Sequence, residues 1–410
     1  MGQAAADQTA SAEVNPQMTD LLLKGGEVLD PSQNLRGTLD IAVQDGSISQ
    51  VAPNIRPGPE TRVVDVSGKL VVPGLIDLHT HVYDGVNQTG VKPDLAGVFS
   101  GVTTLVDAGS AGCYTFGGFP RFIVPESKTR IFCMLHISRA GLNFQPDLSR
   151  REDIDLEETV NVIQANRGLI QGVKIRAVGP GVPRMGIEMV ELAKQAANDG
   201  GVRLMVHIGD RFVEEGGPTI TQQLLPLLEQ GDIITHLFSG NSGNIMGDDG
   251  NVLPELLEAQ ERGVFLDTAH GRQNFSFDVA RRALDGGVVP RSISTDLTIP
   301  GRLHTVHSMT EMLSRFLALG FSLEDVIRMS TINPASALDM ADSLGSLAVG
   351  READISVLEE ATGDWVFQDT EGETLRGDKA LTPVVTIKSG EVFAADWGPR
   401  PWGWLPDAAE

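Results

Sequence analysis

The sequence predicts an α/β fold, a (β/α)₈ barrel of the TIM type with a small β-sandwich domain formed from both chain ends. In residues 73–345, short apolar, β-branched runs alternate with amphipathic helical stretches, which is the pattern of repeated βα units around a parallel sheet. The flanking residues 19–72 and 346–396 contain short β-like runs instead. These observations place one large barrel between the two parts of a smaller domain.

The flanking strands come first in chain order. The runs LLLKGGEVLD, LDIAVQDGSISQVA and TRVVDVSGKLVV precede the barrel, and ADISVLEE and LTPVVTIKSGEVFAA follow it. Asp45-Gly46, between alternating apolar residues, indicates a hairpin. The pattern allows two unrelated strand clusters, but it favours a single sandwich with the barrel inserted. Residues 1–18 are expected to be a disordered tail and residues 397–410 a C-terminal tail.

The barrel strands are eight short runs, namely LIDLHTH (75–81), VTTLVDAG (102–109), IFCMLHI (131–137), GVKIRA (172–177), RLMVHI (203–208), IITHLF (233–238), VFLDTAH (264–270) and SISTDL (292–297). Helical stretches between them include residues 186–198, 251–263 and 308–320. Eight strands spaced roughly 25–40 residues apart fit a barrel better than a six-stranded open sheet. The doubly wound alternative also lacks a Gly-rich phosphate fingerprint after its first strand.

Composition excludes several classes of function. No apolar run approaches the ~18 residues of a membrane-spanning helix, and the first residues carry neither the basic nor the apolar region of a signal peptide. A formal net charge of -23 opposes binding to nucleic acid and to anionic membranes. The two cysteines, Cys113 and Cys133, do not make a disulfide framework. We therefore expect a cytoplasmic protein with no nucleic-acid or membrane partner.

Polar residues of the metal-binding kind stand near the carboxyl ends of five predicted strands, where barrel enzymes keep their active sites. They are His79 and His81 on the first strand, Lys174 on the fourth, His207 on the fifth, His236 on the sixth and Asp296 on the eighth. A single strand histidine is more often a hydrogen-bonded core residue than a ligand. Six such residues at matching depth are hard to explain by packing alone.

Lys174 is the most informative of these residues because it lies inside the apolar strand run GVKIRA. Lysine is almost never fully buried without a partner, and an ammonium group would repel nearby cations. A carbamate formed from the amine and CO₂ would instead bridge two metal ions. The alternative is a lysine that extends from the end of the barrel into water.

The motifs PGLIDLHTH, a fourth-strand Lys, HxG on the fifth strand, THxF on the sixth and STD on the eighth resemble the amidohydrolase superfamily. The resemblance covers about residues 19–395. Within the superfamily, the chain is most similar to the amidohydrolase/deacetylase metallohydrolases, relatives of dihydroorotase. The stretches GVTTLVDAGSAG, AHGRQNFSFDVA, STDL and LSRFLALGFSLEDVIRMSTINPA carry this narrower similarity.

The resemblance implies a binuclear metal-dependent hydrolase of C–N, or ester, bonds. His79, His81 and Asp296 would hold one divalent ion, His207 and His236 the other, and carbamylated Lys174 would bridge them. A ligand set of N and O atoms suits Zn²⁺ and tolerates Mn²⁺, Co²⁺ or Fe²⁺. A hydroxide bridging the metals would attack an acyl amide or ester, with Asp296 as general base and then acid.

Substrate contacts are expected from the loops that follow the strands. Arg176 shares the inward face with Lys174 and could pair with a substrate carboxylate, and Arg139, Arg184 and Arg272 are further candidates. Any single arginine is more often a surface or loop-bracing residue. His270 is expected to orient the substrate or to form a supporting hydrogen bond. The expected partner is thus a small, carboxylate-bearing molecule, and a homo-oligomer is expected.

Other histidines and one cysteine are given smaller roles. His136 is expected to be structural, while His304 and His307, at the start of a helix, have no assigned role. The D-aminoacylases, which the chain also resembles, replace the bridging lysine by a cysteine from the second-strand region. Lys174 is present here, so Cys113 is interpreted as an apolar loop residue.

Three alternative functions remain open on the sequence. A cyclic amide hydrolase, such as a dihydroorotase or hydantoinase, would use the same metals with different substrate loops. A mononuclear deaminase would lack a bridging lysine, so Lys174 counts against it. A non-catalytic binding scaffold would have lost ligands, and all six are retained.

Overall fold

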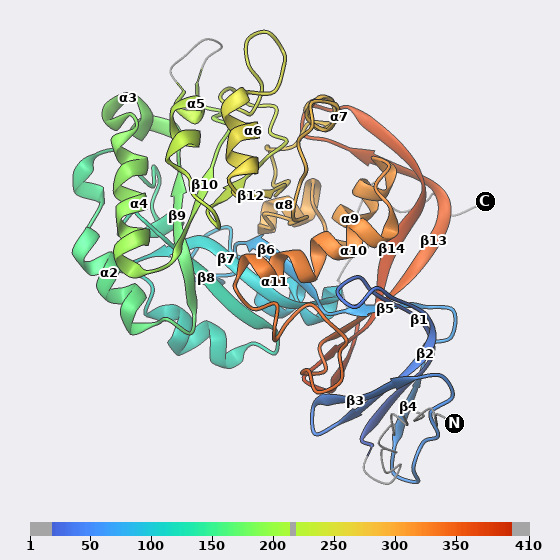
Figure 1. The fold of residues 1–410 in the computed structure, drawn as a ribbon. Helices are drawn as coiled ribbons and strands as arrows, with labels where there is room; N and C mark the ends of the chain where they lie inside the picture. Colours follow the sequence, from blue (N-terminus) through green and yellow to red (C-terminus); the bar gives the residue numbers. More distant parts are fainter. Residues whose placement is uncertain (1–18, 214–218, 396–410) are drawn as a thin grey trace, which may run out of the picture.

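The computed structural model describes residues 19–213 and 219–395, and its centre is a parallel sheet that curves into a barrel (Figure 1). Seven strands follow one another in chain order around it. They are β6 (Leu75–Thr80), β7 (Val102–Gly112), β8 (Arg130–His136), β9 (Ile170–Arg176), β10 (Arg203–His207), β11 (Ile233–Thr235) and β12 (Phe265–Asp267). The predicted barrel is confirmed, and the first seven predicted strands fall on these elements.

The eighth predicted strand, residues 292–297, closes the barrel without forming a regular ladder. Isolated parallel bridges join Asp267 to Ser292 and Thr80 to Leu297. The buried carboxylate of Asp77 adds a side-chain link, because it accepts hydrogen bonds from the backbone N–H (3.0 Å) and hydroxyl (2.6 Å) of Thr295. The segment therefore joins β12 to β6 and completes the barrel.

Helices cover the outside of the barrel (Figure 1). Their bounds are α1 Pro93–Ala96, α2 Leu156–Ala165, α3 Val182–Met185, α4 Glu188–Gly200, α5 Thr221–Leu224, α6 Pro254–Glu261, α7 Phe277–Asp285, α8 Ile299–His304, α9 Met309–Ala318, α10 Leu323–Ser330 and α11 Ile332–Ala337. In α9 the hydroxyl of Ser308 accepts from the N–H of Glu311, which caps the helix start. Its spaced residues Met309, Met312 and Phe316 are buried.

The two chain ends come together outside the barrel, as predicted, and both contribute to one mixed, eight-stranded sheet. Its strands are β1 (Leu21–Asp30), β2 (Leu35–Gln44), β3 (Ser47–Ala52), β4 (Arg62–Asp65), β5 (Leu70–Pro73), β13 (Ile355–Gln368), β14 (Thr374–Lys388) and β15 (Glu391–Ala394). The predicted hairpin joins β2 to β3. Asp45 (φ 48°) and Gly46 (φ 72°) both have the positive φ values of a tight hairpin turn. The predicted tails, residues 1–18 and 397–410, lie outside the described residues.

The β13–β14 hairpin runs from the small sheet along the barrel (Figure 1). Ile355 and Ile387, at one end of the hairpin, belong to the core of the small sheet. Trp365 and Phe367, further along, belong to the main core of the barrel. One pair of strands thus contributes to both cores.

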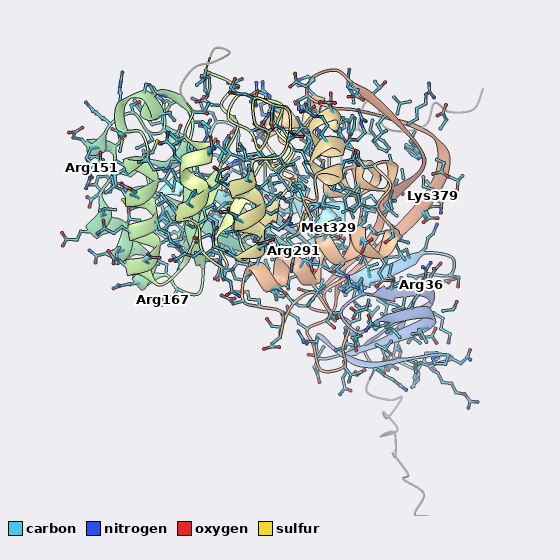
Figure 2. All side chains as sticks on the ribbon, turned by 45° about the horizontal axis from the view of Figure 1, so that its top comes forward. Arg36, Arg151, Arg167, Arg291, Met329 and Lys379 are labelled. Atoms are coloured by element: carbon cyan, nitrogen blue, oxygen red, sulfur yellow. The ribbon has the colours of Figure 1, made fainter. Side chains whose placement is uncertain are left out.

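Charged side chains such as Arg151, Arg167 and Lys379 lie on the outside of the molecule (Figure 2). Their charged groups therefore stay in water. Among the helices of the described residues, none has the length and apolar character needed to cross a bilayer.

Candidate metal centre

The predicted ligands meet at the floor of a cavity at the carboxyl ends of the barrel strands. The cavity has a volume of about 1310 Å³. Five of the predicted ligands line it, namely His79, His81, Lys174, His207 and Asp296. The sixth, His236, follows β11 directly, and its ring centroid lies 4.0 Å from that of His207 and 5.0 Å from that of His79. The structure therefore brings all six residues into one cluster.

Donor atoms of His79, His236 and Asp296 lie within 4.8 Å of one another, close enough to share one ion. Asp296 Oδ1 is 3.0 Å from Nε2 of His81 and 3.5 Å from Nε2 of His79. A carboxylate and imidazole nitrogens form a donor set suited to Zn²⁺ and related cations.

Two of these residues adopt a backbone conformation that side chains normally avoid. His236 has φ 68° and Asp296 has φ 51°. Such strained positions gather at functional sites. Gly271 makes room for one of them, since a Cβ built at Gly271 would lie 2.2 Å from Oδ2 of Asp296. The chain thus turns Asp296 and His236 into the cluster at a cost in local backbone energy.

Lys174 is 1% exposed although it carries an amine. Its Nζ lies 3.3 Å from Nε2 of His79 and 3.6 Å from the sulfur of Met205. Burial, which outweighs the nearby carboxylates, lowers the pKa of Lys174 to about 7. Gly109 (φ 93°) accommodates the side chain, because a Cβ there would come within 2.7 Å of Lys174 Cγ.

The residues present fit a divalent cation. Nε2 of His236 is buried and has no hydrogen-bond partner among the described residues, while Nδ1 lies 2.7 Å from the carbonyl oxygen of Ala269. A buried polar atom without a partner is costly, and a metal ion would satisfy it. Burial lowers the pKa of His79 to about 4 and that of His236 to about 3, so both rings are neutral at pH 7.

Asp296 is ionised in this cluster. Burial acts to raise the pKa of Asp296, but His79, His81 and His236 together hold it below its ordinary value. An ionised carboxylate beside neutral imidazoles is the protonation state that metal binding requires.

The chain has relatives among known proteins. The model of the amidohydrolase family matches residues 70–392. This chain belongs to the amidohydrolase family. It is similar to a deacetylase of Brucella anthropi, with 34% identity over 362 residues that cover 87% of this chain and 88% of the relative. As a member of its family, it is a hydrolase that acts on C–N bonds.

Two crystal structures resemble this amidohydrolase over more than nine-tenths of the chain. One is described as an adenine deaminase, with a TM-score of 0.84, 28% identity, and coverage of 92% of this chain and 100% of that chain. The other is described as a dihydroorotase, with a TM-score of 0.83, 32% identity, and coverage of 91% and 98%. Both structures confirm the fold, which consists of the barrel and the additional sheet.

Two of the predicted substrate residues of this amidohydrolase, Arg176 and Arg272, line the cavity. Arg176 already has a partner, because its Nη1 lies 2.8 Å from Oδ1 of Asp147. The other carboxylate oxygen of Asp147 lies 3.2 Å from Nε2 of His136. Arg176 therefore forms part of a bracing network, whereas Arg272 has no ion-pair partner in residues 19–213 and 219–395.

Arg139 and His270 are not among the described residues that line the cavity. The guanidinium of Arg139 lies over the ring of Tyr114, 5.5 Å from its centroid. His270 is fully buried, stacks on Phe275 and accepts a hydrogen bond from Arg315. The structure thus places both side chains in supporting contacts.

The remaining candidates of the sequence are not among the described residues that line the cavity. Cys113 is buried in the main core, as expected of an apolar residue. Arg184 is hydrogen-bonded to the carbonyl of Ser149. His307 places its ring 2.7 Å from the carbonyl oxygen of Arg302, and its backbone N–H donates to Glu311. His304 lies exposed at the end of α8.

Sequence reasoning missed several residues of the cavity wall. Arg211 adds a third guanidinium, and its pKa is lowered by burial and by Arg176 and Arg272. Phe144 and Phe212 line the wall although they are 69% and 59% exposed. Arg211 and Phe212 follow His207 closely in the chain, so the loop after a ligand-bearing strand was the signal that could have identified them.

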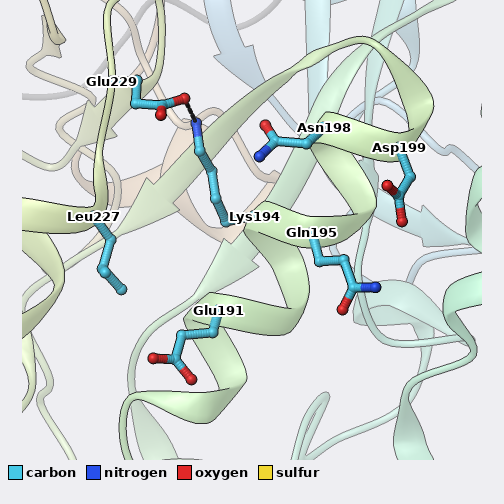
Figure 3. Close-up of a pocket in the computed structure, with 7 residues that line it drawn as sticks. All are labelled: Glu191, Lys194, Gln195, Asn198, Asp199, Leu227 and Glu229. Carbon is cyan, nitrogen blue, oxygen red and sulfur yellow. Dashed lines mark ion pairs between the residues drawn. The ribbon is translucent and has the colours of Figure 1, made fainter.

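A second depression lies on the outer face of α4 (Figure 3). Lys194 reaches across it to Glu229, at 2.9 Å, and to Asp232, at 2.6 Å. Its cation is therefore neutralised within the protein, and the depression does not present a reactive group comparable to the barrel centre.

Proposed function

We propose that this amidohydrolase removes an acyl group, of the acetyl type, from an amide or ester in a metal-dependent reaction. The observation that carries the proposal is the convergence of His79, His236 and Asp296 beside a buried Lys174 at the floor of a large cavity. The chain is similar over most of its length to a protein named deacetylase, and this similarity supports the proposed removal of an acyl group.

The proposed cofactors are two divalent cations, with Zn²⁺ favoured. His79, His81 and Asp296 would hold one, and His207 and His236 the other. Such ions, when bound, lower the pKa of a coordinated water and polarise a carbonyl group. Asp296 would accept the proton of the attacking water and deliver it to the leaving nitrogen or oxygen.

Lys174 is proposed to be carbamylated between the two ions. Its neutral amine would attack CO₂, forming an N–C bond and releasing one proton, and the resulting carboxylate would face the histidines. The buried position, 3.3 Å from Nε2 of His79, supports this reaction. The lowered pKa of the amine makes the neutral form available near pH 7.

The proposed substrate carries a carboxylate on the leaving portion. Asp147 already compensates Arg176, so the remaining cations of the wall, Arg272 and Arg211, are better placed to bind it. A guanidinium binds a carboxylate through paired N–H donors. The cyclic amides of the dihydroorotase and hydantoinase type form the alternative substrate class.

The test is a screen of the Zn²⁺-loaded enzyme with N-acetyl and O-acetyl acids of both enantiomers, their neutral ester analogues, and dihydroorotate and hydantoin. We expect hydrolysis of an acetylated acid, with a preference for one enantiomer. Faster turnover of the neutral analogues would contradict the proposal that the substrate carries a carboxylate. Faster ring opening of dihydroorotate or hydantoin would show that the enzyme is a cyclic amide hydrolase and not a deacetylase.

Metal analysis tests the centre itself. Protein purified without chelator should contain close to two divalent ions per chain. Lys174→Ala should lose activity and metal, with partial recovery on adding a short carboxylic acid. Lys194→Ala, which removes a lysine from the outer face, is the matched control and should keep both. One ion in fully active enzyme would contradict the binuclear proposal.

A further inference from the structure

The two ring nitrogens of His79 lie in different surroundings. Nε2 faces the candidate metal centre, 3.3 Å from Nζ of Lys174 and 3.5 Å from Oδ1 of Asp296. Nδ1 points away from the cavity and lies 2.7 Å from the hydroxyl oxygen of Thr235. Thr235 is the last residue of β11 and is fully buried.

The hydroxyl proton of Thr235 is directed to a buried carboxylate. Asp267, at the end of β12, accepts hydrogen bonds of 2.6 Å from the hydroxyls of Thr235, Ser292 and Ser294. A carboxylate that takes three hydroxyl donors on its two oxygens acts as an acceptor only. Thr235 has a single hydroxyl proton, and Asp267 receives it.

The hydroxyl oxygen of Thr235 can therefore only accept from His79. Because a neutral imidazole carries one proton, that proton must be on Nδ1, and Nε2 keeps a lone pair. We propose that Thr235 and Asp267 are positioning residues, which hold His79 in the Nδ1–H tautomer with Nε2 directed to a metal ion. The role of the ion rests on the proposed function, whereas the tautomer does not.

Two other histidines of the centre support the inference. Nδ1 of His236 lies 2.7 Å from the carbonyl oxygen of Ala269, which can only accept, so His236 adopts the same tautomer by a different contact. Nδ1 of His81 lies 3.0 Å from the hydroxyl of Ser110, whose backbone N–H donates to Asp107. A hydroxyl group next to a buried carboxylate thus lies beside Nδ1 of both His79 and His81. Metal-binding histidines are generally oriented through their second nitrogen in this way.

The first experiment reads the tautomer in metal-free protein. ¹⁵N-histidine NMR of the wild type, with the His79 signal assigned by its loss in His79→Asn, should show protonated Nδ1 and unprotonated Nε2. Thr235→Val removes the hydroxyl at nearly equal volume, so the Nδ1–H population should fall. Thr235→Ser keeps the hydroxyl, so the Nδ1–H population should stay at the wild-type level.

The second experiment measures Zn²⁺ affinity by competition with a chelating dye. Thr235→Val should bind Zn²⁺ about 10- to 100-fold more weakly than the wild type, the usual effect of removing a partner of a metal ligand. Thr235→Ser should stay near the wild-type value. Thr104→Val is the matched control, since Thr104 is a buried barrel threonine whose hydroxyl has no hydrogen-bond partner in the described chain.

The outcomes separate the inference from the proposed function. Protonated Nε2 on His79 in the wild type, or an unchanged tautomer and Zn²⁺ affinity in Thr235→Val, would overturn the inference. Failure of the wild type to bind Zn²⁺, with the tautomer shift present, would overturn the metal centre and leave the positioning of His79 supported.

Discussion

At the scale of single residues, the candidate centre depends on side chains placed where their usual protonation is altered. Lys174, His79 and His236 are all buried, and the pKa of each is lowered, so the cluster presents two neutral imidazoles, an amine whose neutral form is populated near pH 7, and the carboxylate of Asp296. The sequence could predict the six candidate ligands because strand alternation and the barrel architecture aim them at one place. It could not predict the role of Thr235, because that role depends on a contact between two strands.

Replacing Asp296 by Asn separates proton transfer from metal binding. Asn tolerates the positive φ of this position, and its amide oxygen can still act as a ligand, so the metal content should be kept. We expect kcat for amides to fall by a factor on the order of 10²–10⁴, the usual contribution of a positioned acid–base group. Activated aryl esters should lose less, because their leaving groups need no proton. Equal losses for both substrates, with metals measured on the same sample, would show that Asp296 does not protonate the leaving group.

The ion pair between Asp147 and Arg176 should make stability depend on pH in the acid range. Burial acts to raise the pKa of Asp147, but Arg176 and then His136 lower it to about 2, from 3.8. A depressed pKa gives stability that is present above the unfolded value and is lost as the pH falls toward the folded one. The carboxyl should thus contribute about 2 kcal/mol above pH 5, lost between pH 4 and 2. Urea unfolding at several pH values should show that the free energy of unfolding falls more steeply between pH 4 and 2 in the wild type than in Asp147→Asn. Parallel curves of this free energy against pH would contradict the prediction.

At the scale of elements, the eighth strand shows the limit of sequence prediction. The sequence predicted a strand at residues 292–297, and this segment does lie between β12 and β6, where the barrel closes. The sequence could not show that Asp296 has a left-handed backbone conformation. It also could not show that Ser292 and Ser294 donate their hydroxyls to Asp267 in a segment that forms no regular ladder. Isolated bridges and side-chain hydrogen bonds thus take the place of a regular eighth ladder.

The turn after β12 should be sensitive to a single methyl group. In Gly271→Ala the added Cβ would meet Oδ2 of Asp296 at 2.2 Å, so the carboxylate must move. A displacement near 1 Å can reduce a rate about 100-fold, and we expect a loss of kcat/KM of that order. Gly287→Ala is the matched control, because Gly287 also has a positive φ of 89° but its Cβ would meet no atom within 4 Å. Both variants should lose about 1 kcal/mol of stability from backbone strain, and only the first should lose activity. Equal activity losses in the two would show that strain, not contact with Asp296, is responsible.

At the scale of the whole molecule, the sequence predicted that both chain ends join in one small domain, and the structure confirms the shared sheet. The length of the β13–β14 hairpin was not predictable from the sequence. The half of the hairpin that lies away from the small sheet has polar residues on its exposed side, and its other side packs on α9. Leu381 in β14 belongs to the main core, and its N–H donates to the hydroxyl of Ser314 in α9. The hairpin therefore ties the barrel helices to the sheet formed by the chain ends.

This connection should make the small sheet and the barrel unfold together. Trp365 is 1% exposed and lies in the main core, on the same strand as Ile355 in the core of the small sheet. Truncation of a buried tryptophan costs about 3–5 kcal/mol, and the hairpin should transmit the loss to both parts. In Trp365→Ala, hydrogen exchange followed by mass spectrometry should show faster exchange in residues 35–52 of the small sheet and in residues 203–208 of the barrel, by similar factors. Trp365→Phe, which keeps most of the apolar volume, should change both much less. Faster exchange confined to one of the two segments would show that the sheet and the barrel unfold independently.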